Sequence, residues 1–113
     1  LCEHLLMLGL LTVLYKGVPL AEQALAIRGG SGYALLLGCA HAGLAAWLDY
    51  AADAGLKTPN LVLGGLHLAD ADAAARAAVL TACRRHGVKR LAPGHCTGQQ
   101  FVDDCRATAG KIE

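Results

Sequence analysis

The chain has 113 residues, a formal net charge of +1 and 55% hydrophobic residues. This length suits one domain rather than two, and the apolar content excludes an intrinsically disordered chain. Lysine and arginine are scattered along the sequence, so no basic surface predicts binding to nucleic acid. Because aromatic residues make up only 4%, we expect a core built from aliphatic and small side chains.

The five cysteines are an odd number, and no two of them form a C-x-x-C pair. This usage is typical of a reduced, cytoplasmic chain rather than a secreted disulfide scaffold. The most continuous apolar run, 5–14, is interrupted by Gly9 and Thr12 and is too short to cross a bilayer. It also lacks a basic flank and a small-residue cleavage site, so we expect neither a signal peptide nor a membrane segment.

The first part of the chain predicts an antiparallel arrangement. Residues 5–15 form either a buried strand or a short helix, because their apolar run has no decisive period. Residues 16–19 have the composition of a turn. Segments 23–28 and 33–37 flank a glycine-dominated loop at 29–32, which predicts a hairpin.

The second part alternates helical and strand patterns. The expected elements are a helix at 42–54, a strand at 61–64, a helix at 70–86, a strand at 88–92 and a last helix from Thr97 or Gly98 to about Thr108. Right-handed crossovers between parallel strands would place the helices on the same face of the sheet. The sequence therefore predicts an α/β fold with a mixed sheet and helices on one face.

One face of this sheet needs a cover that the predicted helices do not supply. Segments 35–37 and 61–63 are apolar at every position, which is typical of strands buried on both faces. Helices on one side leave the other face open. The candidates to cover it are the N-terminal segment, a second copy of the chain, or a missing part of a longer protein.

Three apolar runs end in the same way, with a glycine and then a histidine within three residues. The histidines are His41, His67 and His95, which lie 26 and 28 residues apart, about the length of one strand-plus-helix unit. If the runs are neighbouring parallel strands, the histidines share the carboxyl rim of the sheet, where α/β folds bind ligands. Three imidazoles are a known ligand set for catalytic zinc, so we expect zinc or another divalent transition metal there.

Several alternatives stay open at this rim. Histidines and free backbone N–H groups could bind phosphate without a metal, or the histidines could simply serve loops and helix ends. Cys39 and Cys96 are either additional soft ligands or small buried apolar residues. Asp70 and Asp72 are either carboxylates that orient a histidine ligand or helix caps. Thr97 either caps the last helix or binds an oxyanion.

Three short motifs carry a family resemblance. They are G-C-[SA]-H-A-G, matched by Gly38-Cys39-Ala40-His41-Ala42-Gly43, G-G-[FL]-H-L, matched by Gly64-Gly65-Leu66-His67-Leu68, and H-C-T-G, matched by His95-Cys96-Thr97-Gly98. With these motifs in this order and spacing, the chain resembles the metallo-β-lactamase-fold hydrolases. The likeness is to the branch of dihydropterin-ribofuranosylaminobenzene-phosphate synthase-like proteins. It covers 22–113, and it is to the C-terminal half of the family alone.

The resemblance implies one half of an αββα sandwich with metals, usually zinc, at one edge between two sheets. It implies that His95 is the last metal-binding histidine and that His41 and His67 lie in the same cleft, as ligands or substrate contacts. Members of the family mostly hydrolyse phosphoesters, lactams or thioesters with a metal-bound hydroxide. On this basis 22–113 forms the half-domain, and 1–21 is an N-terminal segment of uncertain role.

The family's N-terminal metal signature, H-x-H-x-D-H, is not in this sequence. The chain is therefore either a metal-dependent hydrolase of a phosphoester or related small substrate, or one of two alternatives. The first alternative is a non-catalytic half-domain that forms a homodimer or complements a partner chain carrying the N-terminal half. The second is a phosphate-ligand binder without metal. No catalytic residue is assigned from the sequence.

Overall fold

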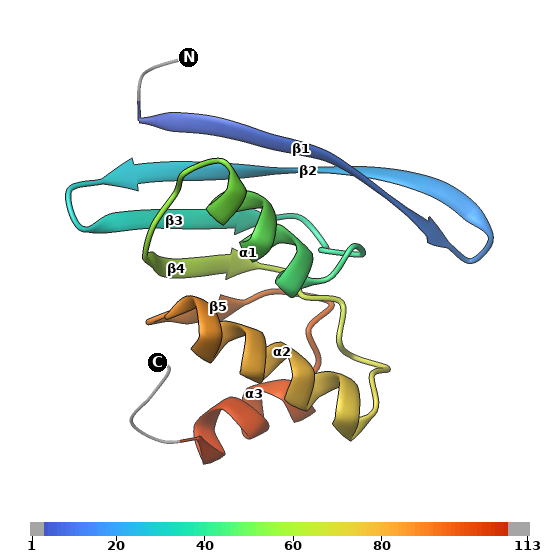
Figure 1. The fold of residues 1–113 in the computed structure, drawn as a ribbon. Coiled ribbons are helices and arrows are strands. Elements are labelled where there is room, and N and C mark those ends of the chain that lie inside the picture. The colour runs from blue at the N-terminus through green and yellow to red at the C-terminus, as the bar shows by residue number, and fades with distance from the viewer. Residues whose placement is uncertain (1–3, 109–113) are drawn as a thin grey trace.

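The structure is a computed structural model that describes residues 4–108 (Figure 1). A single five-stranded sheet has the order β1-β2-β3-β4-β5, and three helices accompany it. The elements are β1 (Leu5–Tyr15), β2 (Val18–Gly29), β3 (Gly32–Leu37), α1 (Leu44–Asp53), β4 (Pro59–Gly64), α2 (Ala73–His86), β5 (Leu91–Pro93) and α3 (Gln99–Ala107).

Strands β1, β2 and β3 form an antiparallel meander. The ambiguous segment 5–15 is a strand, and it pairs with β2 in the same sheet as the rest of the chain. Lys16 and Gly17 join the two strands, both with positive φ (50° and 78°), as the right-handed twist of a two-residue hairpin favours. The hairpin predicted around residues 29–32 is confirmed, with Gly29 paired to Gly32, although β2 begins several residues earlier than expected.

Strands β3, β4 and β5 are parallel, and α1 and α2 are the crossovers between them. Figure 1 shows these helices on the same side of the sheet, as two right-handed crossovers in one direction require. The predicted fold class, an α/β fold with a mixed sheet and helices on one face, is confirmed. Among residues 4–108, no helix combines the length and apolar character that crossing a bilayer would need.

Helix α2 begins and ends as its sequence indicates. Of the two candidate caps, Asp72 is the N-cap, and its Oδ1 accepts a hydrogen bond from the backbone N of Ala75 at 2.8 Å. Gly87 ends the helix in the left-handed conformation, which glycine adopts without steric cost. The last turn carries Arg84, Arg85 and His86, whose positive charge would complement the helix dipole.

The core lies between the helices and one face of the sheet. Along β3 the buried side chains alternate, with Tyr33, Leu35 and Leu37 turned toward the helices. They meet Trp47 and Leu48 of α1, which are almost wholly buried. The mainly aliphatic core predicted from the composition also contains three buried aromatic side chains, Tyr33, Trp47 and Phe101.

The opposite face of the sheet is apolar, and we call it the open face. Strand register and alternation place the following side chains there: Leu5 and Met7 of β1, Leu25 and Ile27 of β2, Ala34 and Leu36 of β3, and Leu61 and Leu63 of β4. Met7 and Leu63 are 52% and 41% exposed. The charged strand residues, Glu22 and Arg28, alternate onto the helix side instead. The structure therefore has the uncovered apolar sheet face that the sequence predicted.

Candidate functional site

The carboxyl ends of the three parallel strands form one edge, which we call the carboxyl rim. Backbone hydrogen bonds join its loops: Gly65 N donates to Gly38 O at 3.0 Å, and Gly94 N donates to Gly64 O at 2.6 Å. The loops after β3, β4 and β5 are therefore held against one another. Their side chains meet because the chain topology delivers them to one edge.

Gly65 allows this close approach. A Cβ at this position would lie 2.6 Å from Cys96 Sγ and 2.7 Å from Gly38 O, both far inside van der Waals contact. Only glycine fits here without moving the neighbouring loops. The glycines of the repeated sequence pattern thus serve loop packing as well as chain turning.

Two of the three predicted histidines stack together. The ring centroids of His41 and His67 are 4.3 Å apart. Tyr15, at the end of β1, packs against both rings, with centroid distances of 4.4 Å to His41 and 5.2 Å to His67. The antiparallel hairpin thereby closes one side of the site.

Glu22 of β2 fixes the position of His41. Its Oε1 accepts hydrogen bonds from the His41 backbone N at 2.6 Å and from Nδ1 at 2.7 Å, and its Oε2 accepts one from Ala42 N at 3.1 Å. Burial alone would raise the pKa of Glu22, but these hydrogen bonds outweigh it and hold the pKa below its usual value. The carboxylate occupies Nδ1, so Nε2 is the ring nitrogen that His41 can offer to a ligand.

The two rim cysteines are in contact. Cys39 Sγ lies 3.0 Å from Cys96 Sγ and 3.4 Å from His67 Nδ1, and the backbone N of His67 donates to Cys96 Sγ at 3.2 Å. Burial, the Cys96 side chain and the negative charge of Glu22 raise the pKa of Cys39 to about 11. Without a cation beside it, Cys39 is therefore a protonated thiol at neutral pH.

The potential ligand atoms form two groups, each within 4.8 Å. One contains Cys39, His41 and His67, and the other contains Cys39, His95 and Cys96. Among residues 4–108, His95 does not share a group with the other two rim histidines, and Cys39 links the two sets. Imidazole and thiol donors are the set that zinc and other borderline-soft ions prefer, so these residues fit a transition metal.

The remaining candidates have mainly structural contacts. Asp72 caps α2, whereas Asp70 lines an open hollow of about 410 Å³ beside His67 and Cys96. Thr97 is buried, and its hydroxyl accepts a hydrogen bond from Leu66 N at 3.1 Å. It therefore holds the loop after β4, and Gly98 is the N-cap of α3.

The sequence interpretation did not include Tyr15 or Glu22. Glu22 did carry a signal, because it is the only carboxylate in a segment that is otherwise apolar or neutral from Val18 to Ile27. Its side chain is only 11% exposed, as an acidic residue is when several donors satisfy it. Tyr15 lies next to a predicted turn, and its sequence neighbours do not indicate a role at the site.

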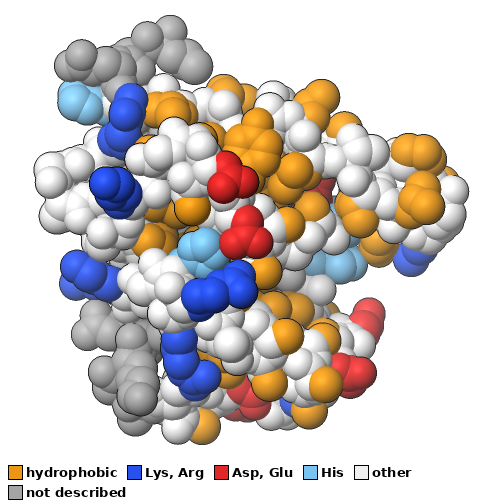
Figure 2. Space-filling view, in the orientation of Figure 1, with side chains coloured by type: hydrophobic (Ala, Val, Ile, Leu, Met, Phe, Trp, Pro, Cys, Tyr) orange, Lys and Arg blue, Asp and Glu red, His pale blue; other side chains and the backbone are white. Residues whose placement is uncertain are grey.

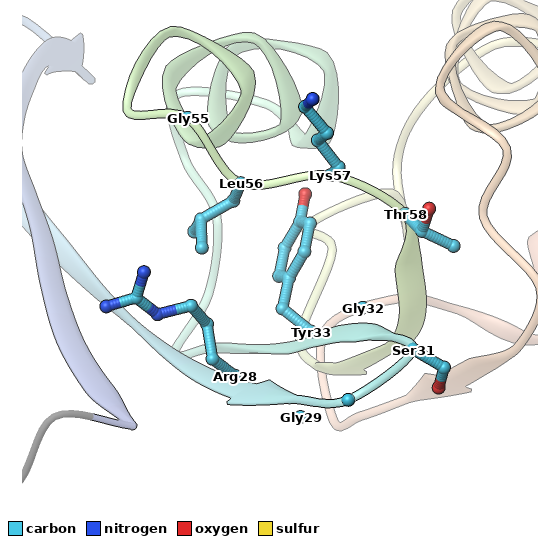
Figure 3. Close-up of a pocket in the computed structure, with 10 residues that line it drawn as sticks. Arg28, Gly29, Ser31, Gly32, Tyr33, Gly55, Leu56, Lys57 and Thr58 are labelled. Atoms are coloured by element: carbon cyan, nitrogen blue, oxygen red, sulfur yellow. The ribbon is translucent and has the colours of Figure 1, made fainter.

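A second hollow lies at the opposite edge of the sheet, where the β2–β3 turn meets the loop before β4 (Figure 3). Its polar side chains are Arg28, Ser31, Tyr33, Lys57 and Thr58, and burial raises the pKa of Tyr33. Its lining contains no histidine, cysteine, aspartate or glutamate. The groups needed for metal binding are therefore at the carboxyl rim and not here.

Comparisons with known proteins agree with the fold. No protein-family model matches the chain. A protein of Methanocaldococcus jannaschii, 7,8-dihydropterin-6-methyl-4-(beta-D-ribofuranosyl)-aminobenzene-5'-phosphate synthase, is 34% identical over an alignment 101 positions long, which covers 80% of this chain and 34% of that protein. A solved structure described as a metal-dependent hydrolase of the β-lactamase superfamily matches with a TM-score of 0.81 and 26% identity.

The match to the solved structure covers 100% of this chain and 51% of the other. The chain thus spans about a third of the curated relative and about half of the solved one. The motifs, the sheet topology and both relatives agree on one assignment. The chain belongs to the metallo-β-lactamase-fold superfamily, its sequence is similar to the branch of the dihydropterin-ribofuranosylaminobenzene-phosphate synthase-like proteins, and it spans part of the length of these relatives.

Proposed function

We propose that this chain supplies one half of a metal-dependent hydrolase site, with a phosphoester or a related small ester as substrate. The observation that carries the proposal is the pair of linked His/Cys groups at the carboxyl rim. The description of the solved relative as a metal-dependent hydrolase supports the reaction class. The 5'-phosphate in the name of the curated relative supports a phosphorylated ligand.

His41 and His67 on one side and His95 on the other would offer ligand atoms to zinc or another divalent ion, and Cys39 belongs to both groups. A divalent metal at this position would lower the pKa of a bound water and polarise the bond to be hydrolysed. Glu22 keeps the proton of His41 on Nδ1 and fixes the ring orientation, so that Nε2 faces the site as an acceptor. Tyr15 packs against the rings of His41 and His67, of which His41 is the more shielded from water.

The two ligand groups contain imidazoles and thiols but no carboxylate. A hydrolase of this kind also needs a base to accept a proton from the attacking water. We propose that a second α/β layer, packed on the open face, supplies the missing groups. The coverage of only 51% of the solved relative supports this, since that protein has about as much chain again.

For the chain by itself, we propose that a second copy covers the open face. The face carries no charged strand residue, and the net charge of +1 opposes self-association only weakly. Exposed apolar faces of this extent usually mark an interface. The projecting β1–β2 hairpin adds Leu10 and Leu14, which are 63% and 72% exposed, and Figure 2 shows hydrophobic side chains on this hairpin.

Light scattering during size-exclusion chromatography tests the dimer. We expect a dimer for the wild-type chain and a monomer for Leu36→Lys, because a buried unpaired charge would oppose the interface. Ala78→Lys, on the exposed side of α2, adds the same charge elsewhere and should remain a dimer. A wild-type chain that stays monomeric at high micromolar concentration would contradict self-association.

Hydrolysis assays test the reaction class. Zinc-loaded protein is offered a generic phosphodiester and a generic thioester, with chelator-treated protein as reference. We expect metal-dependent turnover that falls at least about 100-fold in His41→Ala. His86→Ala is the matched control, because His86 pairs with Asp49 at the end of α2 instead. Metal binding without any hydrolysis would instead favour the non-catalytic half-domain.

A further inference from the structure

Two cysteines that lie 57 residues apart in the chain meet at the carboxyl rim. Cys39 follows β3 and Cys96 follows β5, and the intervening strand β4 separates their strands in the sheet. Their sulfur atoms are 3.0 Å apart, and a ligand nitrogen of His95 lies in the same group within 4.8 Å. Three donor atoms from two different loops therefore converge on one position.

The spacing of these atoms is close to that of a tetrahedral metal site. Zinc–sulfur and zinc–nitrogen bonds of about 2.3 and 2.0 Å imply ligand separations of roughly 3.5–3.8 Å. For two sulfur ligands the expected separation is about 3.8 Å, so the 3.0 Å between Cys39 Sγ and Cys96 Sγ is about 0.8 Å shorter. Small side-chain rotations would open it, because both thiols border space that is not filled by protein.

His67 supplies a polar contact to each of the two sulfur atoms. The backbone N of His67 donates to Cys96 Sγ, and the ring Nδ1 of His67 lies beside Cys39 Sγ. N–H donors of this kind stabilise negative charge on a metal-bound sulfur. Gly65 has no side chain, and any Cβ there would collide with Cys96 Sγ and crowd the ring of His95.

The position is also accessible. The hollow of about 410 Å³ beside Cys96 opens on one side. Another hollow of about 200 Å³ is lined by Cys39 and Glu22 among others. Cys83 and Cys105, by contrast, lie on helices away from the rim and belong to neither ligand group.

We propose that Cys39 and Cys96 bind a thiolate-preferring divalent metal ion, zinc in the first instance, with His95 as the third ligand. At this position His67 is a positioning residue, because its backbone N donates to Cys96 Sγ and its ring Nδ1 lies beside Cys39 Sγ. The inference rests on the proposed function only for the presence of a metal at the rim. It deepens that function by making sulfur, rather than imidazole alone, the principal donor, and it holds whether or not the protein hydrolyses an ester.

Cobalt(II) titration of the fully reduced protein without oxygen tests the site. We expect one Co²⁺ per chain, with a near-ultraviolet sulfur-to-cobalt charge-transfer band that zinc abolishes by displacement. Cys39→Ser and Cys96→Ser should each lose most of the band and bind zinc at least about 10-fold more weakly. Cys105→Ser removes a thiol outside the site and should keep the band unchanged.

The outcomes separate this inference from the proposed function. Cobalt bound without the charge-transfer band, or a band that survives in both cysteine variants, would overturn the thiolate site while leaving a histidine-bound metal intact. A band of normal intensity in a protein without hydrolysis would uphold the thiolate site and count against the hydrolase. Circular dichroism of each variant, and Cys39→Ala beside Cys39→Ser, separate ligand loss from unfolding.

Discussion

The parallel and antiparallel parts of the sheet contribute differently to the rim. Strands β3, β4 and β5 deliver the potential ligands, because parallel strands end at one edge whatever their detailed register. Strands β1 and β2 deliver Tyr15 and Glu22, which cover and orient the ligands. Chain topology therefore places the chemistry, and hairpin register places the residues that hold it.

The two parts also differ in what would disrupt them. In the parallel part the loops contact one another at glycine positions, so an added side chain would disrupt their packing most. In the antiparallel part the pairings Leu11↔Glu22 and Tyr15↔Val18 set which face each side chain occupies. A slip of one residue would turn Glu22 toward the open face. Loop packing in the parallel part and strand register in the antiparallel part can therefore be tested by separate substitutions.

The largest effect should come from adding volume in the parallel part. Gly65→Ala forces a Cβ against Cys96 Sγ and Gly38 O, and we expect a loss of about 3 kcal/mol in the free energy of unfolding. Urea denaturation measures it. Gly30→Ala, where no atom lies within 4 Å of the added Cβ, should change stability by less than about 0.5 kcal/mol. Equal effects at the two glycines would contradict the close packing of the rim loops.

In the antiparallel part, removal of the Glu22 carboxylate should have the next largest effect. Glu22→Ala leaves the amides of His41 and Ala42 without their acceptor, and we expect a loss of about 2 kcal/mol. Gln23→Ala, at the neighbouring exposed position on the other side of β2, is the matched control. NMR of the His41 ring should also report a changed tautomer in Glu22→Ala, and an unchanged ring would contradict the orienting role.

A smaller effect should follow from removing the cover over the imidazoles. Tyr15→Leu deletes the ring contacts with His41 and His67, and we expect a loss of about 1 kcal/mol. Tyr15→Phe keeps the ring and should be nearly neutral. If both variants lose the same stability, the phenol hydroxyl rather than the ring carries the contact, and the covering role is wrong.

The smallest effect concerns the helix pair behind the parallel part. Arg76 Nε donates to Asp104 Oδ2 at 2.6 Å, and hydrogen bonds from Arg76 and Gln100 hold the pKa of Asp104 below its ordinary value of 3.8. The charged form thus favours the folded state. Its contribution is complete above about pH 3.8 and is lost as the pH falls through the lower folded pKa.

Urea denaturation across acidic pH measures this dependence. Asp104→Asn should lose a little stability at neutral pH and show a flatter decline at low pH than the wild-type chain. Asp103→Asn is the control, because Asp103 is more exposed and its contact with Arg106 is long at 4.0 Å. A decline in Asp104→Asn as steep as in the wild-type chain would exclude this ion pair as a source of acid sensitivity.

The sequence predicted the parallel part of the molecule better than the antiparallel part. Repetition of strand, glycine and histidine was enough to bring Cys39, His41, His67, His95 and Cys96 to one edge. It did not separate His95 from the other two histidines, because that depends on how each loop leaves its strand. The open face was also predictable, since apolar residues on both faces of a strand require two covers.

The antiparallel part depends on information that no local pattern contains. The apolar run of β1 fits a strand or a helix equally well, and its pairing with β2 decides the matter. Glu22 reaches His41 only because the two-residue turn at Lys16 and Gly17 fixes the hairpin register. Contacts between residues that different strands bring together remain the part of a site that sequence periodicity misses.

The most direct test of the account is native mass spectrometry of the chain purified without chelator, which reports metal content and assembly together. The account predicts a dimer with close to one zinc ion per chain, and Cys39→Ser and Cys96→Ser dimers without it. A fully reduced wild-type chain that remains monomeric and takes up no zinc when the ion is supplied would contradict both the metal site and the covered face.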